Sequence, residues 1–376
     1  MKSNLLHIIQ GGKGGTLEYL KHFLPLLDKD KFDITVICHG EIFLELKELG
    51  FNVVNINMER AISPLSDIRS LLQISNYLKT HKVDLMHLHS SKAGFLGRLA
   101  AKWHGIPCVY NPHGWSFNIR TNSIKKNMYK LLERMAASWT DKIVAISGSD
   151  YLSALEEKIC TPRKLELIEN GIDLTRYVNK TDFSFKQQIG FDSEEKIVGM
   201  CARLTEQKNP LVFIDIAKCV TQQLSDCKFV LVGDGELREQ VENRIKELHL
   251  DQNVLMTGWT TCPEKYVNIF DVGLLTSKWE GFGLALAEYM ACGKPVVASR
   301  IHGIPYVVRD TIDGFLCEPD NVNEFAEYII KVLTDDMLYE KISEAVVKRA
   351  EENFNILRVI KQHERLYEEL LAKQIK

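Results

Sequence analysis

The sequence predicts an α/β protein made of two successive doubly wound halves, each with a parallel sheet covered by helices. Short β-branched runs alternate with helix-length amphipathic segments, which is typical of parallel sheets. The alternation restarts at Lys196, and 376 residues suit two domains of roughly 100–200 residues each. Ligands of such folds bind beyond the carboxyl ends of the strands. We therefore expect a site in a cleft between two facing halves.

Apolar runs and helical periodicity predict the elements of the first half. In chain order they are strand 5–9, helix 17–27, strand 34–38, helix 43–49, strand 53–56, helix 71–78, strand 85–88, helix 93–103, strand 108–110 and a closing strand 142–146.

The second half repeats this pattern. Its expected elements are strand 196–201, helix 210–222, strand 228–232, helix 237–248, strands 254–257 and 272–276, helix 284–291, strand 295–298 and a charged helical end from 322 onward. Turn chemistry in Asn-Gly-Ile-Asp places the boundary near Asn170–Asn179. The predicted domains are 1–172 and 180–356, with a final helix at about 357–376 that packs back on the first domain.

Composition excludes several classes of protein. A net charge of −3 and a pI of about 6.4 argue against a nucleic-acid partner. The nine cysteines are scattered without a CxxC pair, so we expect reduced thiols and neither a zinc site nor a disulfide framework. No apolar run approaches the roughly 20 residues that span a bilayer. We expect a cytoplasmic protein, at most peripheral on the inner face of the cell membrane.

A glycine-rich loop, Gly11–Thr16, follows the first strand and precedes a helix, where backbone N–H groups can approach a phosphate. A dinucleotide fingerprint would need a third glycine where Leu17 stands, and a P-loop would need a terminal Gly-Lys-Ser/Thr. A phosphate-binding loop and a tight turn without a ligand both remain open.

The second half carries more specific chemistry. Arg203 ends a predicted strand, and Lys208 follows in the same loop, so both cations can reach one diphosphate. Gly233-Asp234-Gly235 predicts a tight strand-to-helix turn. Glu280 lies in a loop after a strand and Glu288 lies inside the following helix, so two carboxylates at different depths suit two sets of sugar hydroxyls. Either glutamate alone would be an ordinary surface carboxylate.

These motifs together resemble the family 4 glycosyltransferases, which are retaining enzymes of the two-domain GT-B fold. The resemblance covers most of the chain. The matching segments are Glu280-x7-Glu288, Arg203 with Lys208-Asn209, Gly233-Asp234-Gly235, Asn170-Gly171-Ile172-Asp173, Ala291–Val297 and Pro112-His113-Gly114.

The resemblance implies a role for each matching residue. Arg203 and Lys208 would hold the donor diphosphate, Glu280 would bind the transferred sugar, and Glu288 would bind the ribose. His113 would reach the sugar from the first domain, which would bind the acceptor. The expected catalytic residues are thus His113, Arg203, Lys208 and Glu280. The other expected donor-binding residues are Gly14, Gly15, Gly281, Phe282, Gly283 and Leu284, through their backbone amides.

Two segments depart from the family pattern. The loop has Thr16-Leu17 where Gly-Gly-x-Glu is common, with Glu18 one place late. Gly303-Ile304-Pro305-Tyr306 lacks the glutamate of a Gly-x-Pro-Glu motif. A contact of the donor with a glutamate at these two places cannot be carried over.

The implied reaction transfers a hexose from a nucleoside diphosphate sugar, with UDP expected, to a glycan or polyprenyl-linked acceptor, with retention. Fixed cations replace a metal at the leaving phosphate, because the only Asp-x-Asp, Asp28-Lys29-Asp30, suits a solvated turn. No cofactor is expected. A sugar-nucleotide epimerase and a non-catalytic nucleotide-binding protein are the alternative functions.

A basic amphipathic segment lies between Arg120 and Arg134, with Lys125, Lys126 and Lys130 against the single acid Glu133. Such a helix, near Trp115 and Phe117, can contact an anionic membrane. An ordinary half-buried helix with a solvated basic face fits the same pattern.

Overall fold

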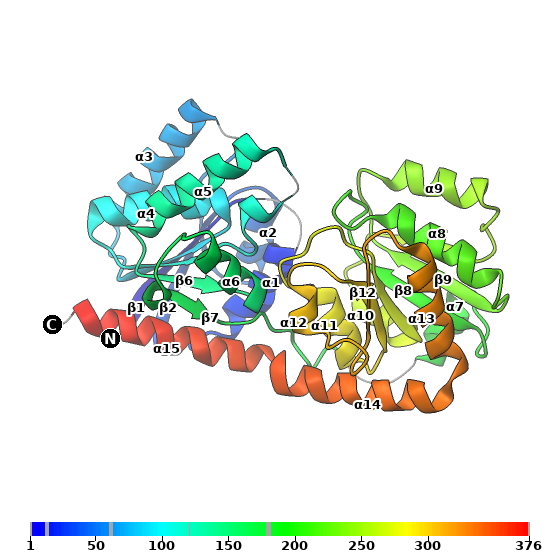
Figure 1. Cartoon of the computed structure of the whole chain (residues 1–376). Coiled ribbons are helices and arrows are strands. Elements are labelled where there is room, and N and C mark those ends of the chain that lie inside the picture. The colour runs from blue at the N-terminus through cyan, green and yellow to red at the C-terminus, as the bar shows by residue number, and fades with distance from the viewer. Residues whose placement is uncertain (1, 12–14, 60–62, 120, 178–181, 375–376) are drawn as a thin grey trace. The chain divides into compact units, whose positions relative to one another are not determined.

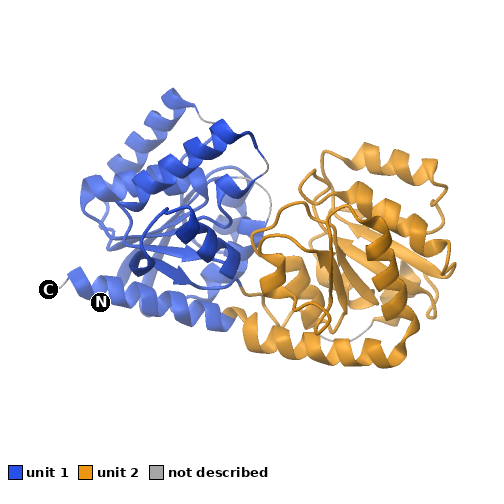
Figure 2. Cartoon of the chain, in the orientation of Figure 1, with its two compact units in different colours: residues 1–170, 357–376 blue, residues 171–356 orange. Residues whose placement is uncertain are grey.

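Both predicted sheets are present in the computed structural model of the chain, and all strands within them pair in parallel (Figure 1). The structure describes residues 2–11, 15–59, 63–119, 121–177 and 182–374. The chain divides into two units (Figure 2). Unit 1 comprises Met1–Asn170 and Leu357–Lys376, and unit 2 comprises Gly171–Ile356.

Unit 1 contains a seven-stranded sheet of order β3-β2-β1-β4-β5-β6-β7. Its strands are β1 (Ser3–Ile9), β2 (Phe32–Cys38), β3 (Asn52–Asn55), β4 (Leu85–His89), β5 (Cys108–Asn111), β6 (Lys142–Ala145) and β7 (Leu165–Leu167). Its α-helices are α1 (Gly15–Phe23), α2 (Glu41–Glu48), α3 (Pro64–Thr80), α4 (Ser91–His104), α5 (Ser123–Ala137), α6 (Gly148–Glu156) and α15 (Ile356–Gln374). Short 3-10 turns cover Leu24–Leu26, Ser116–Asn118 and Pro162–Lys164.

The prediction that the sheet closes at 142–146 is wrong, because β7 pairs in parallel with β6 beyond it. β7 is only the three residues Leu165–Leu167, with a glutamate between two leucines. A strand this short gives no periodicity that separates it from a loop.

Unit 2 contains a six-stranded sheet of order β10-β9-β8-β11-β12-β13. Its strands are β8 (Lys196–Cys201), β9 (Cys227–Val232), β10 (Val254–Gly258), β11 (Val272–Leu275), β12 (Val296–Ser299) and β13 (Phe315–Cys317). Its helices are α7 (Phe183–Gln188), α8 (Pro210–Thr221), α9 (Arg238–Glu247), α10 (Pro263–Ile269), α11 (Leu284–Ala291), α12 (Ile304–Val307), α13 (Val322–Thr334) and α14 (Asp336–Asn353). The short strand β13 and helices α7, α10 and α12 are additions to the predicted pattern.

The order of each sheet reverses at one point, between β1 and β4 in unit 1 and between β8 and β11 in unit 2. Loops that leave neighbouring strands at such a point diverge and open a crevice at the carboxyl ends of the strands. The loops after β8 and β11 carry Arg203, Lys208 and Glu280.

Alternation along β1 and β4 gives the two faces of the first sheet different characters. Leu6 and Ile8 of β1 join Met86 and Leu88 of β4 in an apolar core that also contains residues of α3 and α4. The intervening residues of these two strands include three histidines, His7, His87 and His89, which are fully buried.

Helix α15 covers this histidine face and ties the C-terminal segment to unit 1. The hydroxyl of Tyr367 lies 2.6 Å from Nδ1 of His87, and the ring of His363 packs edge-on against Phe23 of α1. Among the described residues, no helix combines the length and apolar character needed to span a membrane.

Candidate active site

The turn after β9 holds the Arg203 loop in place. Gly233 has φ of +137°, and a Cβ there would lie 2.0 Å from the carbonyl oxygen of Ala202. Only glycine therefore allows this close approach. The Leu204 amide completes the junction by donating to the carbonyl oxygen of Asp234 at 3.0 Å. The predicted tight turn thus lies directly against the segment that contains Arg203.

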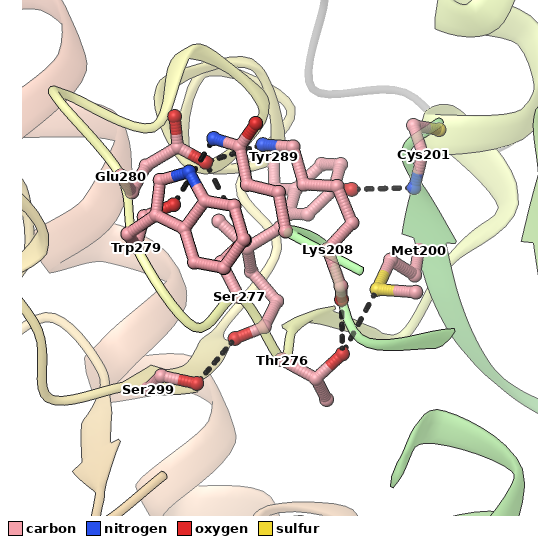
Figure 3. A network of polar contacts seen from close by, with 11 residues as sticks. Met200, Cys201, Lys208, Thr276, Ser277, Trp279, Glu280, Tyr289 and Ser299 are labelled. Carbon is pink, nitrogen blue, oxygen red and sulfur yellow. Dashed lines mark hydrogen bonds and ion pairs between the residues drawn. The ribbon is translucent and has the colours of Figure 1, made fainter. Parts of the chain in front are cut away.

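Lys208 and Glu280, on the loops after β8 and β11, are in direct contact (Figure 3). Nζ of Lys208 donates to Oε2 of Glu280, and Oγ of Ser277 donates to the same oxygen at 3.4 Å. The two side chains are 17% and 13% exposed. This limited exposure strengthens their attraction relative to an ion pair in open water.

Further hydrogen bonds join the two loops. Oγ1 of Thr276 donates to the carbonyl oxygens of Lys208 and Asn209 at 2.9 and 3.1 Å. Nε2 of Gln207 donates to the carbonyl oxygen of Trp279 at 3.0 Å. The position of Lys208 relative to Glu280 is therefore set by the backbone as well as by the ion pair.

Arg203 is partly exposed and differs from Lys208 in its contacts. Within the described part of the chain, its guanidinium makes neither a hydrogen bond nor an ion pair. All five of its N–H donors are therefore available to an incoming anion.

The segment Gly281–Leu284 leads into α11. Gly283 has φ of +95° and caps the helix, which begins at Leu284. Phe282 is buried with its ring edge-on to Phe354, so only its backbone can face a ligand. Among the described residues, the N–H groups of Gly281, Phe282 and Gly283 find no hydrogen-bond acceptor. Together with the dipole of α11 they form an edge that can bind an anion.

Glu288 lies within α11 and is joined to Tyr177, a residue that the sequence analysis missed. Burial raises the pKa of Tyr177 well above its ordinary value, and the charge of Glu288 and a hydrogen bond to it act in the same direction. Arg176 anchors this segment through an ion pair with Glu264 at 3.0 Å. Glu288 and Glu280 thus have separate partners, as two independent ligand contacts would require.

Two of the predicted donor-side residues lie in the described part of unit 1. Gly15 begins α1, whereas Gly14 lies outside the described residues. His113 follows β5 with φ of +53°, and its amide donates to Oδ1 of Asn111 at 3.1 Å. Burial, with a smaller contribution from His363, lowers the pKa of His113 to about 3. The imidazole is therefore neutral near pH 7.

The surroundings of α5 correct two parts of the membrane hypothesis. Trp115 and Phe117 are buried and stacked on one another, with ring centroids 5.2 Å apart, so neither ring is available to a lipid. Glu133 points inward to Arg98 at 2.8 Å, and Lys130 pairs with Glu157 at 2.6 Å. The acid next to the basic face is thus Glu157 and not Glu133.

Comparison with known proteins gives matches across both units. The family model described as "Glycosyltransferase Family 4" matches residues 13–176, and "Glycosyl transferases group 1" matches residues 181–349. A curated relative from Escherichia coli, UDP-Gal:alpha-D-GlcNAc-diphosphoundecaprenol alpha-1,3-galactosyltransferase, is 33% identical over 93% of this chain and 92% of its own length. N-acetyl-alpha-D-glucosaminyl L-malate synthase of Bacillus anthracis is 26% identical over 85% and 84% of the two chains.

The solved structure of Anabaena HepE in complex with UDP and glucose superposes with a TM-score of 0.81 at 22% identity, and covers 96% of this chain and 98% of that one. Paired parallel sheets of this kind, in a chain with such relatives, define a glycosyltransferase of the GT-B fold. The chain belongs to the family 4 glycosyltransferases.

Proposed function

We propose that this glycosyltransferase moves a hexose from a UDP-linked donor onto a hydroxyl of a lipid-linked glycan, with retention of anomeric configuration and without a bound metal. The observation that carries the proposal is the contact of Lys208 with Glu280 beside the Arg203 loop, at the point where the order of the second sheet reverses. The E. coli relative, named as a galactosyltransferase acting on a diphosphoundecaprenol-linked sugar, makes UDP-galactose the first donor to test.

The chemistry requires positive charge at the leaving diphosphate. As the bond between the sugar and the phosphate breaks, negative charge grows on the phosphate oxygens, and fixed cations stabilise that charge. Within the described residues, Arg203 has unused donors and the N–H groups of Gly281, Phe282 and Gly283 have no acceptor, and Lys208 is held nearby in the same loop. In this proposal Glu280 accepts hydrogen bonds from hydroxyls of the sugar, and Glu288 accepts those of the ribose.

These cations supply the charge that a metal would otherwise provide. The Asp28-Lys29-Asp30 turn supports this view, because the Asp28 carboxylate already accepts a hydrogen bond within the turn. The amide of Asp30 donates to Oδ1 of Asp28 at 2.9 Å, and the amide of Asp28 donates to Glu364 of α15 at 2.7 Å. Full activity after removal of divalent ions with a chelator is expected. Loss of activity that Mg²⁺ or Mn²⁺ restores would contradict this part.

Retention follows, in this proposal, from a reaction on one face of the sugar in which the leaving phosphate takes the proton of the acceptor hydroxyl. Proton NMR of the first product should show the same anomeric configuration as the donor. An inverted product would exclude the same-face mechanism.

Donor identity is tested first by thermal stability of the wild type and Arg203→Ala with UDP, GDP, ADP and NAD. A nucleotide at a hundredfold excess over its dissociation constant adds about 2.7 kcal/mol of stability. UDP should stabilise the wild type and the control Arg244→Ala, whose guanidinium pairs with Asp215 and Glu247 on α8 and α9. It should stabilise Arg203→Ala much less. Selective stabilisation by another nucleotide would replace UDP as the carrier.

The acceptor is tested by incubating the enzyme with UDP-galactose, UDP-glucose or UDP-N-acetylglucosamine and a lipid diphosphate-linked N-acetylglucosamine. A product heavier by one hexose, detected by mass spectrometry, is expected with UDP-galactose or UDP-glucose. Transfer to the water-soluble sugar alone, at the same rate as to the lipid-linked form, would argue against a lipid-linked acceptor.

We further propose that α5 places the enzyme at an anionic membrane. Four apolar residues at helical spacing are exposed on α5, namely Ile124, Met128, Leu131 and Met135. Ile124 is 83% and Leu131 64% exposed, and Lys125 is exposed on the same helix. An apolar stripe flanked by cations suits the boundary between headgroups and acyl chains.

Flotation with liposomes that contain phosphatidylglycerol tests this surface. The double variant Ile124→Glu with Leu131→Glu should lose binding, and Lys125→Glu with Lys126→Glu should lose the dependence on anionic lipid. Met337→Glu, at an 83% exposed position on α14, is the matched control. Unchanged flotation of both double variants would exclude α5 as the contact.

A further inference from the structure

Three imidazoles form a continuous hydrogen-bonded chain in unit 1. Nδ1 of His7, on β1, lies 2.9 Å from Nε2 of His89, on β4. Nδ1 of His89 lies 3.0 Å from Nε2 of His113, in the loop after β5. The chain begins in the core, where His7 and His89 are fully buried, and ends at a partly exposed residue of the predicted donor site.

The groups packed around this chain leave it uncharged. His87 of β4 pairs with Tyr367 of α15, and Nδ1 of His363 pairs with the carbonyl oxygen of Val359 at 2.9 Å. Tyr19 of α1 places its ring edge-on to His113. In the described part of the chain, neither a carboxylate nor an ammonium group is hydrogen-bonded to the three rings. Burial keeps the pKa of His7 and of His89 well below the ordinary value, so the rings are neutral at neutral pH.

Neutrality forces the three tautomers to agree in direction. A neutral imidazole has one N–H donor and one bare nitrogen. If His113 donates from Nε2 to His89, then His89 donates to His7, and Nε2 of His7 carries a proton. In the opposite direction His7 donates to His89, His89 donates to His113, and Nδ1 of His113 carries the proton.

The inner end of the chain decides between the two directions. Nε2 of His7 is buried without a hydrogen-bond partner. In the first direction it would be an unpaired buried N–H, and in the second it is an unpaired acceptor. Among backbone groups, an unpaired buried N–H is rarer than an unpaired acceptor, and we apply the same preference to the imidazole. The second direction is therefore favoured.

We propose that His7 and His89 are positioning residues that hold His113 in its Nδ1–H tautomer, so that Nδ1 donates a hydrogen bond to an oxygen of the bound sugar nucleotide. This inference rests on the proposed function and on the family resemblance, which implies that His113 contacts the transferred sugar. A His113 of this tautomer has no bare nitrogen toward the substrate. It therefore cannot deprotonate the acceptor, and that task falls to the leaving phosphate.

Nitrogen-15 NMR of the histidine-labelled full chain tests the tautomer directly, with His113 assigned from a His113→Gln spectrum. Protonated Nδ1 and bare Nε2 are expected for His113 in the wild type at neutral pH. Protonated Nε2, or a positively charged ring, would overturn the proposal. The measurement uses the free protein, so failure of the proposed transfer activity leaves its result intact.

Two substitutions at one position separate the hydrogen bond from packing. His89→Asn places an amide N–H near the position of Nδ1 and should preserve the tautomer of His113. His89→Leu removes the donor, so the proton of His113 should redistribute toward Nε2. The value of kcat/KM should fall about tenfold, the effect of one lost hydrogen bond. His87→Asn is the control, because His87 lies in the same cluster but outside the hydrogen-bonded chain of three imidazoles. It should change neither the tautomer of His113 nor kcat/KM.

An unchanged tautomer in folded His89→Leu would overturn the proposal. If His89→Leu does not fold, the wild-type and His89→Asn spectra decide. Metal analysis provides a further test, because the ligand nitrogens of His7, His87 and His89 lie within 4.8 Å of one another. A stoichiometric metal bound there would break the bond between His7 and His89, and so would also overturn the proposal.

Discussion

At the scale of single residues, the main finding is that Lys208 and Glu280, for which different ligands are predicted, form an ion pair with each other. Lys208 was predicted to hold phosphate and Glu280 to hold sugar, and in the structure the two are joined. The pair orients both side chains, whereas Arg203 has no side-chain partner among the residues that the structure describes. Arg203 and Lys208 therefore differ in their contacts: within the described residues the guanidinium of Arg203 has no partner, whereas Lys208 is paired with a carboxylate.

The first prediction concerns Lys208. Lys208→Ala should lower kcat by about 10²–10³-fold, because it removes a cation from the developing charge and the partner from Glu280. Steady-state kinetics with saturating donor measure the effect, with Lys348→Ala at an exposed position of α14 as the control. A kcat within threefold of the wild type would show that Lys208 serves only the fold.

The second prediction concerns Tyr177. Tyr177→Phe removes the hydroxyl that bonds Glu288 and should cost about 1 kcal/mol of folding stability. Because Glu288 is then less firmly placed, UDP affinity should fall roughly fivefold. Denaturant titration and calorimetric UDP binding measure the two effects. Unchanged UDP affinity would show that Glu288 does not contribute to binding of the nucleotide.

Which of these contacts the sequence could predict depends on their distance along the chain. Local turns such as Gly233-Asp234-Gly235 were recognised, because their residues are adjacent. The pairing of Lys208 with Glu280 was not, since it depends on β8 and β11 being neighbours in the sheet. Tyr177 gave no signal, because an aromatic residue near a turn usually belongs to the core.

At the scale of elements, long periodic segments were predicted and short ones were not. Helix α8 was expected at 210–222 and runs over Pro210–Thr221. The strands β7 and β13, of three residues each, were missed because alternation needs more residues to be visible. The segment of α15 was expected to be helical, but two of its buried residues, His363 and Tyr367, were not distinguished from its charged surface.

The third prediction concerns the contact of α15 with the histidine face. Burial lowers the pKa of His7 to about 3 and that of His363 to about 4, both below the value of 6.5 for an exposed histidine. Between the lowered pKa of each folded histidine and pH 6.5, the unfolded chain binds more protons than the folded one. The contribution of these histidines to the free energy of unfolding is therefore fully present above pH 6.5. It falls as the pH drops, by at most about 1.4 kcal/mol per pH unit for each histidine.

Denaturant midpoints measured between pH 7.5 and pH 4.5 check this dependence. His363→Leu should flatten it, whereas His81→Leu, at an exposed position, should not. A midpoint that stays constant to pH 4.5 would mean that the cluster is not buried as a neutral group.

At the scale of the whole molecule, each of the two units has its own sheet and core, and the predicted donor contacts other than Gly14, Gly15 and His113 belong to unit 2. The fourth prediction is that calorimetry resolves two unfolding transitions and that UDP raises mainly the one from unit 2. Arg203→Ala should abolish that shift. A single transition that moves as a whole with UDP would show that the units unfold together.

The path of the chain also has a consequence for biosynthesis. Unit 1 begins at the first residue but is completed only by Leu357–Lys376, after all of unit 2. All of unit 2 is therefore synthesised before the helix that covers the histidine face of the first sheet. The histidine face of unit 1 therefore stays uncovered until the residues of α15 have been synthesised. A chain truncated before Leu357 would leave that face uncovered.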